Sequence, residues 1–530
     1  MSFIRNVGTI GGLTAISRVF GFARDMLFAR LFGAGLAADA FQLAFTLPNT
    51  FRRLFAEGAF SVAFVPMYSK KLHGEEGEEG AGIFANDVLS VFVWVLFAFS
   101  MLCILGMEGI VWLLARDYQS VPGKFELSVT LSRITFPYLG LVSVVALISG
   151  ILNTRSRFGP GASAPILFNL ALLGGLIWGW YFDYTDQLKA FAQSWALPLA
   201  GVLQLAYLWW SVRRAGVRLK LHWPRMTPDT KVLLWRIFPA TFGAGIYQLS
   251  QLADTFFATS LKQGSLTLLK MADRLNQMPL GIVGIALGTA ILPTLSRHIA
   301  GGDSRGAARL QGRAIELATL LTVPAAFALA VCAPAFVNAF FVGGKFTQAD
   351  GQVMSQIVVA LVCGLPSYVL VKVLEPGYFS RGDTRTPVMT AATALSFNIF
   401  LNLVVVRPWG IVGLAAATAC SASLNCLLLY ANLHRRGHFR FDAKLLSRVI
   451  RQVLASAVMA VVLWYLLHAT MPWYSGHVGQ KVFGILLLVG SGLAVYGPIA
   501  WLIGAVDKED LAILARRRSA KTIDEEIPGF

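Results

Sequence analysis

The sequence predicts an all-α polytopic membrane protein of about fourteen transmembrane helices, and three observations lead to that fold class. The 530 residues are 56% hydrophobic and 14% charged, with a mean hydropathy of +0.63, whereas soluble domains carry about 25% charged residues. Long apolar segments recur along the chain, with basic residues gathered in alternate loops. The net charge of +17 therefore reflects topology, and we expect no nucleic-acid partner.

A transmembrane helix needs roughly 20 mostly apolar residues, and about fourteen segments qualify. The first, second and eighth are the least hydrophobic because they carry arginines. The predicted spans lie near residues 7–30, 36–68, 83–114, 128–152, 160–182, 188–211, 232–260, 267–295, 313–342, 353–379, 386–406, 409–433, 448–469 and 480–506.

The charges of the loops set the orientation. With the N-terminus inside, the cytoplasmic segments hold roughly 28 Lys and Arg residues against 9 in the opposite loops, Lys124 and Lys270 among the latter. One missed or invented span would spoil this alternation. The sequence therefore predicts cytoplasmic termini and a multi-pass protein of the bacterial cytoplasmic (inner) membrane. No secretory signal peptide is expected, because Val7–Phe32 contains three arginines and lacks a cleavage site.

The chain also resembles itself at an offset of about 227 to 234 residues. Six spans separate the copies, so both have one orientation, and the two six-helix lobes should be related by a pseudo-twofold axis along the membrane normal. Such lobes suit alternating access. The matches are Val65–Lys70 with Leu292–Arg297, Ala23–Ala29 with Ala253–Ala258, Ala38, Asp39 and Pro48 with Ala272, Asp273 and Pro279, and Asn169 with Asn398.

The repeat divides the chain into five parts, and spans 13 and 14 have no counterpart in it. We expect the basic linker to form an amphipathic helix on the cytoplasmic face. The predicted parts are the N-terminal lobe 1–212, the linker 213–231, the C-terminal lobe 232–436, the appended spans 437–506 and a cytoplasmic tail 507–530.

Five arginines lie inside or beside apolar segments: Arg18, Arg24, Arg52, Arg53 and Arg274. A charge near the bilayer centre costs at least about 2.5 kcal/mol, so it is rarely kept without a partner or a water-filled cavity. An anionic ligand is the simplest reason to gather one sign of charge. The planar guanidinium suits phosphate, with which it forms two parallel hydrogen bonds.

Local pairing is the competing interpretation of these arginines, together with snorkelling to the interface. It explains Arg53 best, because Glu57 lies one turn away, and it leaves four arginines for the anion. Asp39 is a candidate gating acid that latches one lobe to the other. Local pairing could also join Arg24 to Asp25 or Asp39, and Arg274 to Asp273.

Two further groups are polar within apolar spans. Lys372 and Glu375 lie three residues apart, which favours a structural or gate ion pair. A candidate site for a coupling cation, Na⁺ or H⁺, consists of oxygen-bearing residues, for which interhelical hydrogen bonding is the alternative role. Its members are Asp254, Asn398, Asn402 and Thr418.

Signals for an enzyme are poor. No phosphate-binding glycine loop or nucleophile elbow occurs, and His434 and His438 lack the acid of a zinc protease motif. The five cysteines fall within apolar spans and are expected as buried thiols. We therefore predict neither a catalytic site nor a metal site nor an organic cofactor, and leave a coupling cation or the membrane potential as the energy source.

Several segments closely resemble the MurJ (MviN) family of lipid II flippases, and the resemblance extends over essentially the whole chain. They are Ser17–Asp25, Ala38–Phe41, Leu47–Phe60, Ala272–Leu275 and Val371–Gly377, of which the block from Pro48 to Phe60 is the most specific.

The resemblance implies the fold of the multidrug/oligosaccharidyl-lipid/polysaccharide exporter superfamily and a role in peptidoglycan biosynthesis. It implies lipid II, the undecaprenyl-pyrophosphate-linked precursor, as the substrate, with membrane lipids and the cell-wall synthesis machinery as further partners. Spans 13 and 14 would form a groove for the lipid tail. The family's cavity arginines fall on Arg18, Arg24, Arg52 and Arg274, and its functional acid on Asp39.

Three other functions stay open on the sequence. One is an exporter of another polyprenyl-linked glycan or of drugs, and another is a non-transporting scaffold, which would not explain buried cations. The third is a glycosyltransferase acting on polyprenyl phosphate, which would need a carboxylate in a loop and a sugar-donor site; neither is recognisable.

Overall fold

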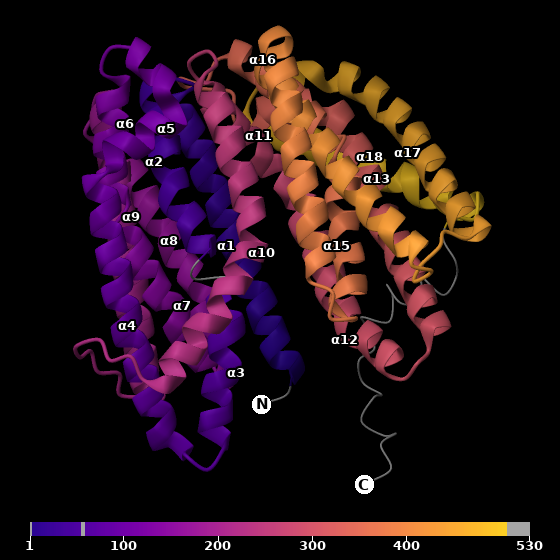
Figure 1. Cartoon of the computed structure of the whole chain (residues 1–530). Coiled ribbons are helices and arrows are strands. Elements are labelled where there is room, and N and C mark those ends of the chain that lie inside the picture. The colour runs from indigo at the N-terminus through magenta and orange to yellow at the C-terminus, as the bar shows by residue number, and fades with distance from the viewer. Residues whose placement is uncertain (1–2, 55–58, 506–530) are drawn as a thin grey trace. The chain divides into compact units, whose positions relative to one another are not determined.

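The computed structural model describes residues 3–54 and 59–505, and all regular structure within them is helical. The prediction of an all-α polytopic membrane protein is confirmed. The helices of the first half are α1 (Phe3–Phe32), α2 (Leu36–Arg52), α3 (Ala59–His73), α4 (Gly77–Leu105), α5 (Met107–Ala115), the short η2 (Arg116–Ser120), α6 (Lys124–Thr135), α7 (Tyr138–Thr154), α8 (Gly159–Tyr181) and α9 (Asp186–Arg214). Those of the second half are α10 (Pro228–Thr259), α11 (Ser265–Pro279), η3 (Leu280–Gly284), α12 (Ile285–Ala300), α13 (Ser304–Phe340), α14 (Gln348–Val362), α15 (Leu365–Phe379), α16 (Arg385–Arg435), α17 (Ala443–Thr470), η4 (Met471–Ser475) and α18 (Val478–Leu502) (Figure 1).

The helices group into two compact units. The first contains Met1–Arg274, Phe340–Met354 and Ala391–Ala417, and the second contains Leu275–Ala339, Ser355–Thr390 and Thr418–Phe530. These units differ from the lobes expected from the repeat, since α10 and the first part of α11 group with the first unit. The lobe boundaries and their pseudo-twofold axis stay predictions.

Within the described residues, nine helices are long and apolar enough to span a membrane. One of them, α16, covers two predicted spans. Its backbone leaves helical geometry at Gly410 (φ 53°, ψ −136°), near the boundary between these spans. The four predicted spans outside this set correspond to α1, to α2 with α3, to α10, and to α11 with α12. These helices carry the charged residues singled out above.

The second span of each repeat copy is interrupted at a matching place. In the first copy, α2 contains Pro48 and ends at Arg52, and the backbone is π-helical at residues 53–54. In the second, α11 ends at Pro279 and a π-helical segment follows at Leu280–Gly284. Such wide turns concentrate at functional sites. The shared interruption supports the duplication.

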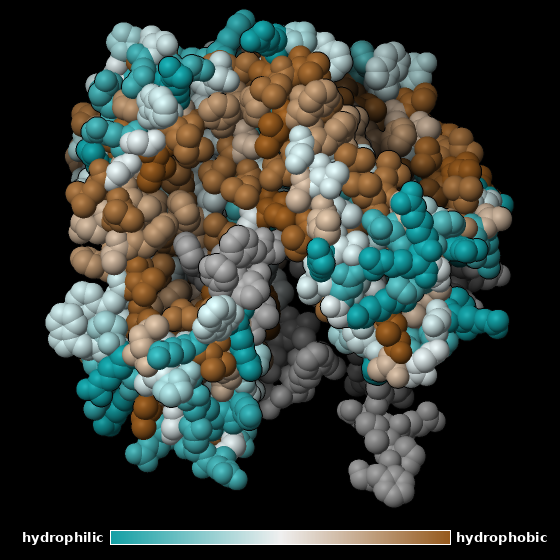
Figure 2. Space-filling view, in the orientation of Figure 1, coloured by the Kyte–Doolittle hydropathy of each residue, from teal (hydrophilic) through white to brown (hydrophobic). Residues whose placement is uncertain are grey.

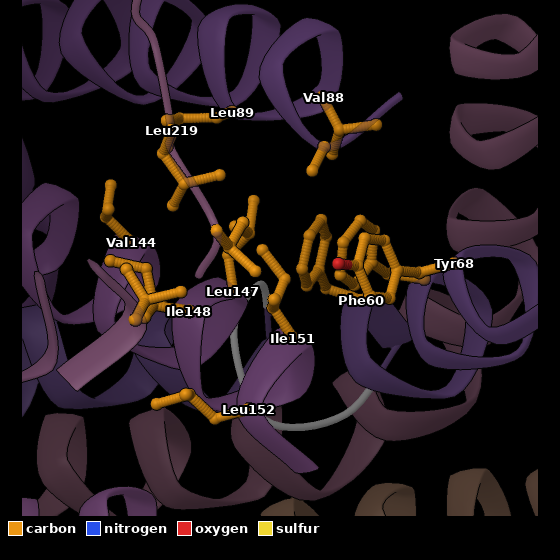
Figure 3. Packing of buried hydrophobic residues seen from close by; sticks show 14 of the residues in the cluster. Phe60, Tyr68, Val88, Leu89, Val144, Leu147, Ile148, Ile151, Leu152 and Leu219 are labelled. Carbon is orange, nitrogen blue, oxygen red and sulfur yellow. The ribbon is translucent and has the colours of Figure 1, made fainter. Parts of the chain in front are cut away.

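A large buried core of the first unit lies where α3, α4, α7 and α9 meet. Phe60, Phe64 and Tyr68 of α3 stack in a row, with ring centroids 5.2 and 5.6 Å apart. Figure 3 shows this row beside the aliphatic side chains of α7, Ile148 and Ile151 among them. Offset stacking adds about 0.5–1.5 kcal/mol per pair to the packing.

The basic linker differs from the predicted amphipathic helix. α9 ends at Arg214 and α10 begins at Pro228, and no helix forms between them. Side chains of α4 bind this extended strap (residues 215–227): Asn86 accepts from the backbone N–H of Lys220 at 2.8 Å, and Ser90 accepts from that of His222 at 3.1 Å. Because α4 satisfies these backbone groups, the strap needs no helix.

The distribution of apolar and polar side chains on the surface of the first unit is that of a membrane protein. Apolar side chains dominate the middle of its visible surface, and polar ones gather toward both ends (Figure 2). Exposed Trp178, Trp180 and Tyr181 end α8, and exposed Trp210 and Trp223 lie near the linker. Aromatic side chains at two levels are typical of the two membrane interfaces.

In the second unit, the appended helices α17 and α18 pack against α13 (Figure 1). A buried ion pair joins α17 to α13: Arg448 donates to Glu316 at 2.6 Å, and the two side chains are 14% and 8% exposed. Tyr496 of α18 donates to the backbone oxygen of Leu320 at 3.0 Å. The appended helices are thus fixed to α13 by polar contacts as well as by packing.

We expect Arg448→Met to lower the stability of the second unit by about 3–5 kcal/mol, because it leaves the Glu316 carboxylate buried without its cation. The Glu316→Gln, Arg448→Met double variant should recover part of that loss, since it removes both charges. Thermal unfolding in detergent measures both variants. Equal melting temperatures for Arg448→Met and the unmodified protein would contradict a stabilising pair.

Candidate functional site

Arg24 of α1 lies at the centre of a buried polar network. Its side chain is 8% exposed and donates to the Asp25 carboxylate at 2.6 and 3.0 Å and to Asn169 Oδ1 of α8 at 3.0 Å. The guanidinium also lies 5.8 and 5.6 Å from the ring centres of Phe45 and Phe168. The aromatic walls favour the cation and exclude water around it.

Asn169 holds this arrangement in place. While its oxygen accepts from Arg24, its amide nitrogen donates to the backbone oxygen of Ser17 at 2.9 Å and to the Ser17 hydroxyl at 3.3 Å. Helix α8 packs closely here, since a Cβ at Gly21 would lie at van der Waals distance, 3.5 Å, from the Asn169 amide. Asn169 therefore fixes the direction in which Arg24 points.

Asp25 joins two of the predicted arginines. Arg274 of α11 contacts its second oxygen, with Nε 3.2 Å from Oδ2, and is 38% exposed. Two guanidinium groups thus share one carboxylate, which leaves an excess of positive charge beside a partly exposed arginine. Arg274 pairs here with Asp25, whereas local pairing predicted Asp273. An anion such as a phosphate would complete the charge balance.

The remaining arginines lie on the same unit. Arg18 is exposed on α1, and half-buried Arg52 donates to Asn49 Oδ1 of its own helix at 3.3 Å. Arg53 lies close enough to Tyr247 and Lys270 to interact with them electrostatically. Its predicted partner, Glu57, lies outside the described residues.

Asp39, the predicted gating acid, is buried at the predicted periplasmic end of the first unit, with 1% of its surface exposed. One carboxylate oxygen accepts from Lys124 Nζ at 2.9 Å and from the Gly264 N–H at 2.7 Å. The other accepts from the N–H and hydroxyl of Thr267 at 3.1 and 2.8 Å. The positive N-terminus of α11 thus meets a carboxylate. We call these contacts between Asp39 and α11 the Asp39 latch.

The same end of the unit is tightly closed around the latch. Gly33 (φ +62°) and Gly264 (φ +90°) have no room for a Cβ, which would lie 2.4 Å from the backbone oxygens of Lys345 and Ala34, respectively. The backbone N–H of Lys345 donates to Arg30 O at 2.8 Å, and its ammonium pairs with Asp186. Loops of both repeat copies therefore interlock here.

The predicted pair in the second unit is present. Lys372 donates to Glu375 Oε2 at 3.1 Å on α15, with side chains 52% and 23% exposed. Exposed pairs of this kind contribute at most about 1 kcal/mol. The geometry therefore fits either role predicted for the pair, structural or gating.

The candidate cation ligands are divided between the units. Asp254, Asn398 and Asn402 belong to the first and are buried, whereas Thr418 belongs to the second. Asn402 Nδ2 donates to Asn398 Oδ1 at 3.0 Å, while Asn402 Oδ1 and Asn398 Nδ2 are buried without a hydrogen-bond partner among the described residues. A buried oxygen of this kind suits a hard cation. Lys270 already places an ammonium near Asp254 and donates to Thr255 at 3.4 Å.

Sequence reasoning missed Lys124 and Lys270, which it counted as loop lysines, and gave no role to Asn169. A signal existed for Asn169, because it matches Asn398 in the repeat. The lysines gave none, since a lysine beside a predicted span boundary looks like any interfacial lysine.

The fold matches solved transporter structures. A structure titled "Lipid II flippase MurJ, inward closed conformation" superposes with a TM-score of 0.76 at 23% identity, covering 93% of this chain and 98% of that one. An inward-facing MATE transporter of the MOP superfamily gives a TM-score of 0.66 at 13% identity, covering 80% and 95%. The helices therefore define the fold class of polytopic transporters.

Sequence comparison is more specific. The family model "Lipid II flippase MurJ" matches residues 28–483. A probable lipid II flippase MurJ of Rhizobium meliloti is 38% identical over 100% of this chain and 99% of its own length. The lipid II flippase MurJ of Burkholderia cenocepacia is 32% identical over 95% and 98%. The chain belongs to the lipid II flippase MurJ family, whose members are transporters and not enzymes, so the resemblance seen in the motifs is confirmed.

The network around Arg24 predicts a graded effect of changes at Asn169. Asn169→Ala removes one neutral contact to Arg24 and should weaken binding of a polyprenyl pyrophosphate about 3- to 10-fold. The isosteric Asn169→Asp gives Arg24 a second carboxylate that competes with the ligand, so we expect a loss of at least about 100-fold. Binding to the purified protein measures both. Equal losses in the two variants would contradict an electrostatic role for the site.

Proposed function

We propose that this protein is a lipid II flippase, which carries the undecaprenyl-pyrophosphate-linked peptidoglycan precursor from the cytoplasmic to the periplasmic leaflet by alternating access. The observation that carries the proposal is the sharing of Asp25 by Arg24 and Arg274 within a membrane unit. A headgroup of charge, sugar and peptide cannot cross hydrocarbon unaided at a useful rate. A cationic site inside the protein offers it a polar path.

The pyrophosphate is the part of the substrate that these arginines suit. Arg274 is partly exposed and can turn its remaining N–H donors to phosphate while Asp25 keeps it near Arg24. Arg18 and Arg52, which lie on α1 and α2, would add charge as the headgroup enters from the cytoplasmic side. Paired N–H donors give charge-assisted bonds that a lysine cannot reproduce.

Helix α11 connects this site to the latch. Thr267 in its first turn binds Asp39, and Arg274, seven residues on, binds Asp25. The two contacts are about 10 Å apart along one helix. A movement that draws α11 away from Asp39 must therefore also shift Arg274. Neutralisation of Arg274 by a phosphate would in this way weaken the hold of α11 on the closed periplasmic end.

The lipid tail needs an apolar path of its own, and we assign it to a groove at α17 and α18. Their outer surfaces expose Val461, Leu486 and Leu493 among other large apolar side chains. The tail would stay in lipid or in this groove while only the headgroup crosses. The protein would reside in the inner membrane with both termini cytoplasmic, in contact with membrane lipids and with the enzymes of cell-wall synthesis.

The energy source divides into two candidates. The membrane potential contributes about 2.3 kcal/mol per charge per 100 mV, and a negative interior favours outward movement of an anion. A cation, Na⁺ or H⁺, held by Asp254 with Asn398, Asn402 and Thr418 is the alternative. Lys270 would compete with such a cation for Asp254.

An exporter of another polyprenyl-linked glycan would use the same arginines. Binding selectivity separates the two, since a lipid II flippase should prefer the complete sugar-peptide headgroup over a polyprenyl pyrophosphate with a different glycan.

We expect Arg24→Ala to lower lipid II translocation by about 10- to 100-fold, because it removes a charge-assisted contact to the pyrophosphate. The measurement is exposure of lipid II at the outer leaflet of cells depleted of the native protein. The exposed Arg116→Ala variant is the matched control and should restore exposure. Normal exposure with Arg24→Ala would contradict the cationic site, and loss of lipid II synthesis on depletion would indicate an enzyme.

If a cation at Asp254 drives transport, Asp254→Ala should abolish the dependence of flipping on a Na⁺ or H⁺ gradient in proteoliposomes. If the potential drives it, the unmodified protein should respond to an imposed potential and ignore both gradients. Flipping by Asp254→Ala at the unmodified rate, with the same gradient dependence, would exclude the carboxylate as a cation ligand.

A further inference from the structure

We propose that Lys124 is a positioning residue of the Asp39 latch: its ammonium holds the buried Asp39 carboxylate in place and so stabilises the closed latch. The inference rests on the latch described under the proposed function. It gives a role to a lysine that the charge pattern alone assigns to a loop.

The burial of Lys124 is the first observation. It begins α6, directly after Gly123 (φ +75°), and its side chain is 3% exposed. A lysine at a membrane boundary ordinarily extends its ammonium into water. Here the ammonium lies 2.9 Å from Asp39 Oδ2 and 3.8 Å from the ring centre of Tyr118, which is itself buried. Topology does not require this burial.

The second observation concerns which contacts move together. Asp39 and Lys124 lie on α2 and α6, which pack side by side, and the buried Thr135 hydroxyl of α6 donates to Ala44 O of α2 at 2.8 Å. These helices belong to one repeat copy. Gly264 and Thr267, the other partners of Asp39 that the structure describes, come from the second copy. When the copies separate, Asp39 loses α11 and keeps Lys124.

This division gives Lys124 a task in the transport cycle. In the closed state the carboxylate is buried, and without the ammonium its charge would be stabilised by α11 alone. In the open state water reaches the carboxylate, so the loss of Lys124 matters less there. Removal of the Lys124 charge should therefore shift the balance toward the open latch, although Lys124 does not touch α11 through any described contact.

The test uses a cysteine at Leu266, which is buried in the first turn of α11. We expect this position to become exposed when the latch opens. A membrane-impermeant maleimide added from the periplasmic side measures its labelling rate in intact cells. We expect Lys124→Met to raise labelling by at least about fivefold and to lower flipping, and Lys124→Arg to behave as the unmodified protein does, because it keeps the charge. Arg116→Met is the control, since Arg116 is an exposed cation of the preceding segment that lies over Trp112 and has no described contact with Asp39 or Asp186.

The double variant separates a latch role from general damage. Asp39→Asn alone should raise labelling, because it weakens the latch and leaves Lys124 unpaired. Asp39→Asn with Lys124→Met removes both charges, while the neutral amide can still accept from α11, so labelling should fall below that of either single variant. If Lys124→Met does not accumulate in the membrane, the comparison of Asp39→Asn with the double variant carries the test.

Three results would overturn the proposal, and they differ in meaning. Labelling of Lys124→Met at the unmodified rate, with raised labelling of Asp39→Asn, would refute the role of Lys124 and leave the latch standing. Unchanged labelling of Asp39→Asn would refute the latch, and the role of Lys124 with it. A double variant no different from Asp39→Asn would also count against Lys124.

Discussion

An ionised side chain buried among membrane helices is stable only beside an opposite charge or a strong hydrogen-bonding partner, and the functional geometry of this protein follows from that constraint. Three carboxylates satisfy it at three places: Asp25 beside Arg24 and Arg274, Asp39 beside Lys124, and Glu316 beside Arg448. The contacts to Arg274, Lys124 and Arg448 join different helices, and the contact to Arg24 lies within α1. The pairs therefore determine which helices can separate and at what cost.

The charge balance differs between these three places, and the difference suggests that each has a different role. Glu316 and Arg448 balance each other and hold α17 on α13. Asp39 is bound by Lys124 and by the N-terminus of α11. Lys124 belongs to the same repeat copy as Asp39, so only α11 can move away without disrupting the packing within that copy. Asp25 serves two arginines, so a further anion bound there would balance the second cation. With Arg274 and Thr267 on one short helix, binding of an anion and release of the closed end become parts of one movement.

The sequence was sufficient for the fold class, because apolar spans and alternating loop charge are properties of single segments. It also singled out Arg24, Arg274 and Asp39 as candidates, since charges stand out in apolar surroundings, and it offered Asp25, the neighbour in sequence, as a partner of Arg24. It did not predict the pairs between helices, because these depend on packing: Arg274 reaches Asp25 and not Asp273, and Lys124 turns inward and not to water. The linker conformation also depends on packing, because side chains of α4 bind its backbone N–H groups and no helix forms there.

If lipid II crosses only when the interlocked periplasmic end opens, a reversible link across that end should block its transport. Asp186 and Lys345 pair there and come from different repeat copies, with side chains 41% and 49% exposed. Cysteines at both positions can be joined by a reducible bismaleimide, with each single-cysteine variant as the control. We expect flipping to stop when the link is complete and to resume after the linker is reduced. Continued flipping by fully linked protein would show that this end need not open.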